Sequence, residues 1–139
     1  MATMCEKCYE VDTRKYKFGR TCKHCGGLLV QIDEMILPTI SLLNKKGYHT
    51  KFCCSGHTYD SFPPYLYFEP YICFERYVKL PCLPDGFRYE RDCAENRFVV
   101  RKNMPDDCEN TYKHMEILKS NLALIEWATE LPQHESNIL

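Results

Sequence analysis

The spacing of hydrophobic positions changes several times along the chain and divides it into helical and extended segments. Between residues 33 and 46, apolar side chains recur at the spacing of one helix face: Ile36, Ile40 and Leu43. Asp33 is the expected N-cap, and Gly47, which follows two lysines, marks the expected end. Pro38 conflicts with a start at Asp33, because proline inside a helix costs about 3 kcal/mol. The helix therefore either begins near Leu37 or is kinked.

The middle of the chain has the pattern of short strands. Runs rich in aromatic and β-branched residues alternate with proline and glycine turns. These runs predict five strands: Tyr48–Cys54, Tyr65–Glu69, Tyr71–Val78, Phe87–Asp92 and Arg97–Arg101. Pro70 makes the third of them the least regular.

Residues 106–131 predict a long closing helix with Asp106 as its N-cap and Glu109 completing a capping box. Its expected buried stripe has helical spacing: Tyr112, Met115, Leu118, Leu122, Ile125 and Ala128. Trp127 is expected at the edge of that stripe. The predicted fold class is α+β, with a mostly antiparallel sheet packed by two main helices.

Bulk composition limits the protein class. The 139 residues are 45% hydrophobic and 27% charged with a net charge of −1, which is typical of a globular protein and argues against a broad polyanion-binding surface. No apolar stretch is long enough for a signal peptide or a membrane span, so we expect a cytoplasmic protein without membrane contact. In that compartment, ten cysteines favour metal ligation over disulfides.

Two C-x-x-C pairs near the N-terminus predict a metal site formed by Cys5, Cys8, Cys22 and Cys25. Four thiolates close a tetrahedral site without an open position, which is typical of structural zinc. The same ligands can hold iron, and a thioredoxin-type redox motif would need a strand before it and a helix after it. We therefore expect a zinc ribbon at residues 1–32, followed by an α+β domain at residues 33–139.

The segment between the two pairs carries basic residues with aromatic residues among them. Four of them are candidate nucleic-acid contacts: Arg14, Lys15, Lys17 and Arg20. Cations can hold a phosphate backbone while Tyr16 and Phe18 stack on bases. The alternative is an ordinary solvated hairpin, because nearby acidic residues offset the charge.

The run Cys53-Cys54-Ser55-Gly56-His57 predicts a strand that ends in a tight turn. One interpretation is an anion site for a nucleotide phosphate, formed by Ser55, Gly56 and His57 with Lys51 nearby. A second is another metal site, in which Cys54 and His57 are completed by Cys73, Cys82 or Cys93. A third is that the cysteines are simply small buried side chains. A Cys–His nucleophilic pair lacks any visible orienting group or oxyanion hole.

These residues also carry two resemblances. The paired C-x-x-C motifs, the run from Leu42 to Tyr48, Cys53 to His57 and the Tyr65-Leu-Tyr-Phe68 run resemble short bacterial and phage zinc-ribbon proteins, which implies no assigned reaction. The turn is also similar to the Ser-Cys-Ser-Gly-Arg turn of the wybutosine-synthesis methyltransferase-like family, with Cys53 and His57 at the two differing positions. That similarity implies RNA modification, but the sequence has no glycine-rich methyltransferase fingerprint.

Three function classes follow. The leading hypothesis is a small non-catalytic zinc protein that binds a nucleotide or nucleic-acid phosphate, as a phage-type protein sequestering a nucleotide signal would. The second is an RNA-modifying enzyme, and the third is an adaptor that contacts a protein partner. The oligomeric state does not follow from the sequence.

Overall fold

The computed structural model describes residues 2–12, 21–58, 67–92, 97–102 and 110–134. Two helices accompany antiparallel sheets, which confirms the α+β class: α1 spans Leu37–Lys45 and α2 spans Asn110–Glu130. In the described part of the chain, neither helix has the length and apolar character that crossing a bilayer requires.

The N-terminal residues form a small sheet of three antiparallel strands. They are β1 (Ala2–Cys5), β2 (Val11–Asp12) and β3 (Leu29–Ile32), in the order β2-β1-β3. Pairing of Met4 with Val30 and of Ala2 with Ile32 fixes the register of β1 against β3. The division into a module at residues 1–32 and a second domain stays a prediction, although β3 ends at residue 32.

The main sheet has four antiparallel strands. They are β4 (Thr50–Cys54), β7 (Tyr71–Phe74), β8 (Phe87–Asp92) and β9 (Arg97–Lys102), in the order β4-β7-β9-β8. Two short strands, β5 (His57–Thr58) and β6 (Tyr67–Phe68), pair with each other. All five predicted strands are present, although the first and third are shorter than the hydrophobic pattern indicated and the predicted start of the second lies outside the described residues.

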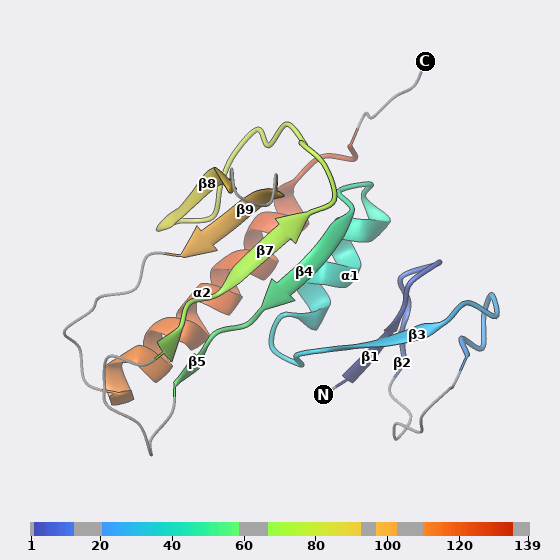
Figure 1. Ribbon diagram of the computed structural model, residues 1–139, viewed down its shortest axis with the longest axis horizontal. Helices are drawn as coiled ribbons and strands as arrows, with labels where there is room; N and C mark the ends of the chain where they lie inside the picture. Colours follow the sequence, from blue (N-terminus) through green and yellow to red (C-terminus); the bar gives the residue numbers. More distant parts are fainter. Residues whose placement is uncertain (1, 13–20, 59–66, 93–96, 103–109, 135–139) are drawn as a thin grey trace.

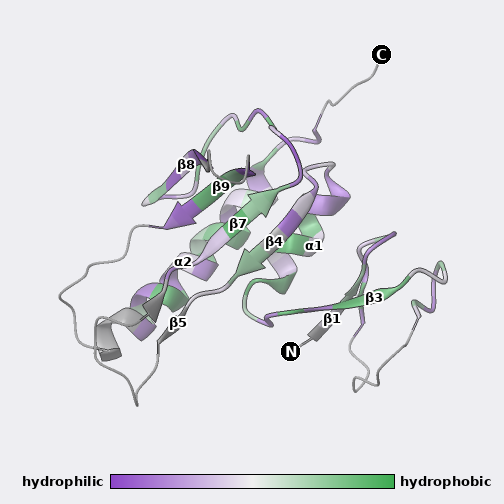
Figure 2. Ribbon diagram, viewed as in Figure 1, coloured by the Kyte–Doolittle hydropathy of each residue, from purple (hydrophilic) through white to green (hydrophobic). Residues whose placement is uncertain are grey.

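Both helices lie against one face of the main sheet (Figure 1). The core forms between that face and the helices, and the side chains that are almost fully buried come from every layer: Ile40, Leu43, Ile72, Phe74, Val100 and Leu124. Figure 2 shows the corresponding hydrophobic stretches in β7, β9 and β3. Met4 of β1 belongs to the same core, so the N-terminal sheet is anchored to α1 by apolar contacts.

The first helix begins at Leu37, with Pro38 in its first turn, where a missing N–H costs nothing. This agrees with one of the two predicted alternatives. The prediction of Asp33 as N-cap was wrong, because Ile36 is the N-cap and no side chain forms a capping hydrogen bond there. The Asp33 carboxylate instead accepts hydrogen bonds from Ser55. At the other end, Gly47 adopts a φ of 93°, as expected for a residue that ends a helix.

The predicted buried stripe of α2 was wrong at three of its residues, whereas its last residue, Ala128, is buried as predicted. Met115, Leu118 and Leu122 are 55%, 54% and 58% exposed. The buried side faces the core through another row: Ile117, Ser120, Asn121, Leu124, Trp127 and Ala128. Ser120 and Asn121 are polar, so a search for hydrophobic positions does not find this row. Their side chains donate hydrogen bonds to backbone carbonyls, which allows them to be buried. The predicted caps Asp106 and Glu109 lie outside the described residues.

Lys46 joins the ends of the two helices. Its Nζ donates hydrogen bonds to the carbonyl oxygens of Ala128 and Thr129 at 2.8 Å and of Leu131 at 2.6 Å. Ala128 and Thr129 belong to the last turn of α2 and Leu131 follows its end, where a positive charge is favourable.

We expect Lys46→Met to lower the free energy of unfolding by about 2 kcal/mol, because three hydrogen bonds from a charged donor are lost, two of them to partly buried carbonyls. Lys45→Met is the matched control, since its pair with Glu10 (3.0 Å) lies between exposed side chains and contributes little to stability. Urea denaturation of both variants measures the difference. Equal losses would contradict a special role for Lys46.

Candidate metal centre

Four thiols converge at the end of the N-terminal sheet. The Sγ atoms of Cys5, Cys8, Cys22 and Cys25 all lie within 4.8 Å of one another. The pair Cys5–Cys25 is separated by 3.4 Å and the pair Cys8–Cys22 by 3.6 Å. A tetrahedral ion with metal–sulfur bonds of about 2.3 Å requires sulfur atoms about 3.8 Å apart. The four predicted residues are therefore positioned to bind a metal ion.

The two C-x-x-C turns have matching backbone geometry. In the first, the N–H of Lys7 donates to Cys5 Sγ, and in the second the N–H of His24 donates to Cys22 Sγ, each at 3.3 Å. Each turn is closed by a backbone bond of 3.0 Å, from Tyr9 to Cys5 and from Gly26 to Cys22. Amide donors aimed at sulfur stabilise thiolates, so both turns are prepared to present anionic ligands.

Backbone donors and the thiol cluster affect the protonation of two of these cysteines in opposite directions. Burial raises the pKa of Cys5, but the N–H groups of Cys8 and Lys7 and the neighbouring thiols lower it to about 6. The backbone of Glu10 lowers the pKa of Cys8, while burial and the adjoining thiols raise it to about 12. Because a thiolate disfavours a second negative charge beside it, an incoming metal ion must displace protons from the cluster.

Gly27 has no side chain, and the sulfur atoms occupy the space where a side chain would lie. A Cβ atom at this position would lie 2.8 Å from Cys5 Sγ and 3.3 Å from Cys25 Sγ. The donor set and this close approach both fit a metal ion held by four sulfurs. No disulfide links these four cysteines.

We expect Gly27→Ala to weaken metal binding roughly 10–100-fold, as displaced ligand surroundings do in other metal sites. Titration against a chromogenic chelator measures the affinity. Gly26→Asn is the control, because a Cβ at Gly26 meets no atom within 4 Å and asparagine tolerates its φ of 77°. Equal affinities for the two variants would contradict the steric argument.

The predicted anion-binding turn has its serine engaged inside the fold. The buried Ser55 directs its N–H and its hydroxyl to Asp33 Oδ2, at 3.4 and 3.2 Å, and its carbonyl accepts a hydrogen bond from Asn121. Gly56 packs so closely that an added Cβ would lie 3.0 Å from Pro70. A phosphate at this turn would have to displace the Asp33 carboxylate, and binding there stays a prediction.

Two further residues, Lys51 and His57, were predicted to contact a phosphate at this turn. Lys51 lies on β4 and is exposed, and the side chain of His57 lies outside the described residues. So do the four basic residues of the N-terminal segment: Arg14, Lys15, Lys17 and Arg20. Their predicted contact with nucleic acid stays untested.

Cys54, Cys73 and Cys82 do not gather into a second metal group among the described residues, which exclude Cys93. Burial raises the pKa of the Cys53 thiol to about 12 and also raises that of Cys54. Both thiols stay protonated at neutral pH, whereas a catalytic nucleophile is a thiolate. This favours the interpretation of these two cysteines as small buried side chains.

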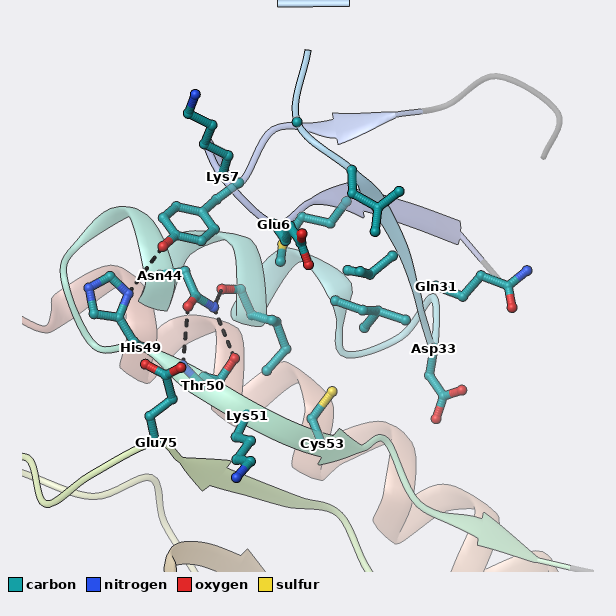
Figure 3. A pocket seen from close by; sticks show the side chains of 17 residues that line it. Glu6, Lys7, Gln31, Asp33, Asn44, His49, Thr50, Lys51, Cys53 and Glu75 are labelled. Atoms are coloured by element: carbon teal, nitrogen blue, oxygen red, sulfur yellow. Dashed lines mark hydrogen bonds between the residues drawn. The ribbon is translucent and has the colours of Figure 1, made fainter. Parts of the chain in front are cut away.

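Sequence reasoning missed a groove of about 750 Å³ beside the metal centre. One wall is the face of the N-terminal sheet together with the cysteine turns, and the other is formed by α1 and β4. Figure 3 shows Glu6 and Cys53 directed into the space between these walls. The residues that line the groove range from position 4 to position 75, so no local sequence motif predicts it.

We compared the chain with known proteins in three ways. No family model matches it, and neither the curated proteins nor the solved structures contain a significant match.

Proposed function

We propose that this chain is a small non-catalytic binding protein in which a structural zinc ion, held by the four N-terminal cysteines as in a zinc ribbon, fixes one wall of a ligand groove. Zinc is the metal of choice for four thiolates without an open position. A closed ligand set leaves no coordination site for a substrate, so the ion supplies stability and not chemistry.

The observation that carries this proposal is the continuity between the metal centre and the groove. Glu6 and Lys7 lie inside the first C-x-x-C turn, while Gly27 and Leu28 follow the second, and all four line the groove. A module of about 30 residues buries little core, so its conformation depends on the metal. The metal would thereby set the shape of one groove wall.

The ligand predicted from the sequence is a nucleotide or nucleic-acid phosphate. The engaged donors of Ser55 do not favour the turn as its site, although the basic N-terminal segment stays a candidate contact. RNA modification, which the wybutosine resemblance implies, stays the second hypothesis, although the sequence has no glycine-rich methyltransferase fingerprint. For the adaptor hypothesis, the groove is the surface that would contact the protein partner.

Native mass spectrometry of freshly purified protein, with metal analysis of the same sample, tests the proposal. We expect one zinc per chain and no turnover of S-adenosylmethionine. Chelation should increase amide hydrogen exchange in residues 2–12 and 21–32 before it affects the main sheet. Absence of zinc, or iron in its place, would refute the metal assignment, and a methylated RNA product would refute the non-catalytic assignment.

A further inference from the structure

We propose that the groove binds an extended peptide segment, which adds as a further strand to the edge of β4. This inference rests on the proposed function, because it names the ligand class of a binding protein. Among the described strands, β4 pairs with β7 on one side and is the terminal strand of the sheet on the other. A terminal strand offers backbone N–H and C=O groups with which an incoming strand can pair.

The hydrogen bonds at the two ends of β4 define which part of this edge is open. The N–H of Thr50 donates to Asn44 Oδ1 at 3.1 Å, and the N–H of Ser55 donates to Asp33 Oδ2 at 3.4 Å. Side chains thus cover both ends. Because backbone direction alternates along a strand, the backbone of Cys53 faces the same way as that of Ser55, beside the groove. Among the described residues, the backbone N–H and C=O of Cys53 are therefore the groups of this edge that lie beside the groove between the two covered ends.

The opposite wall matches the side chains of such a strand. Leu28, Val30 and Ile32 occupy alternate positions and present apolar side chains to the groove. Met4 and Ile40 lie beneath this surface in the core. Since alternate side chains of an extended peptide point the same way, this wall favours apolar residues at every second position.

The charges around the groove favour a basic peptide over a phosphate. Figure 3 shows the Glu6 carboxylate directed into the groove and Glu75 beside His49 at one end, while Lys7 and Lys51 extend away from it. Opposite charges steer a partner toward a site and like charges suppress the wrong one. A nucleic acid would bring its phosphates toward these carboxylates.

Tyr9 provides a second, independent indication. It has a φ of 66°, in the left-handed region, at the position where the other cysteine turn has Gly26 with a φ of 77°. A non-glycine residue in this conformation costs on the order of 1–3 kcal/mol and such residues cluster at ligand sites. Its ring borders the groove, and its hydroxyl lies 3.2 Å from His49 Nδ1.

Tyr9→Gly tests the groove without removing the metal. Glycine suits the turn, as Gly26 demonstrates in the other pair, so the variant should retain its metal while losing one groove wall. Leu28→Ser removes an apolar groove residue that is 51% exposed, so its fold should persist. Leu122→Ser is the matched control, because Leu122 is 58% exposed on α2 and does not line the groove.

The probes are fluorescein-labelled heptapeptides in which valine, isoleucine or tyrosine alternates with threonine. Each peptide has a lysine at both ends. Fluorescence polarisation with the full zinc-loaded chain should show saturable binding that backbone N-methylation abolishes. Tyr9→Gly and Leu28→Ser should each weaken it by roughly tenfold or more, and Leu122→Ser should leave it unchanged. Replacing the terminal lysines with glutamates should also weaken binding.

The proposal is overturned if no peptide of the set binds, if methylated and unmethylated peptides bind equally, or if Tyr9→Gly binds as the unmodified chain does. Polyuridylate that binds the groove and is lost in Leu28→Ser would assign the site to RNA instead. Metal analysis of each sample keeps the two proposals apart. A chain that holds zinc without binding peptide refutes only the ligand class, and one without zinc refutes the proposed function.

Discussion

Cys5→Ser is expected to remove the metal and unfold the N-terminal sheet while the four-stranded sheet persists. Cys5 is fully buried, its sulfur receives two backbone N–H bonds, and it contacts Cys25 across the cluster. A serine hydroxyl is a poor zinc ligand at neutral pH, because zinc sites of this type need deprotonated sulfur. The metal content should fall from one ion per chain to nearly none.

Metal analysis and amide hydrogen exchange measure these two effects. Protection should be lost in β1 and β3 and retained in β7 and β9, because only the first two strands depend on the cysteine turns for their ends. Cys82→Ser is the matched control, since Cys82 is an exposed cysteine outside the cluster. Full metal content in the Cys5 variant would show that this thiol is not a ligand.

Leu124→Ala is expected to lower the free energy of unfolding by about 2–5 kcal/mol, the usual range when a buried leucine leaves a cavity. Leu124 has no exposed surface and packs in the core between α2 and the main sheet. Typical domains are stable by only about 5–15 kcal/mol, so this is a large fraction of the total.

Leu122→Ala, two residues earlier on the same helix, tests which side of α2 is buried. Leu122 is exposed, so its truncation should change stability by no more than about 0.5 kcal/mol. Urea denaturation of both variants gives the comparison. If the Leu122 variant were the less stable one, the stripe predicted from the sequence would be right and the observed packing wrong.

The sequence predicted elements whose causes are local. Proline and glycine fix the ends of α1 through the backbone angles they allow, and a start near Leu37 follows from Pro38 alone. The bounds of β8 agree with the prediction, because aromatic residues alternate with charged ones from Phe87 to Glu90, which is a local strand pattern. The cluster of four cysteines positioned to bind a metal ion was found because two C-x-x-C turns each preset their own sulfur geometry.

Prediction failed where a partner far along the chain decides the outcome. Asp33 lies before a helix and has the right side chain for a cap, but Ser55, 22 residues later, takes its carboxylate. In α2, hydrophobicity alone selected the wrong side, because Asn121 reaches the carbonyl of Ser55, 66 residues away, and is stabilised in the interior by that bond.

The sequence by itself therefore determined the α+β class, the helix and strand segments and the cysteine cluster, because these depend on backbone preferences and on ligands a few residues apart. Only the tertiary structure decided which face of α2 is buried, what the Ser55 turn contacts, and that β4 and the N-terminal sheet enclose a groove. Those features arise from contacts between segments that are distant in sequence, where burial and hydrogen bonding outweigh local propensity.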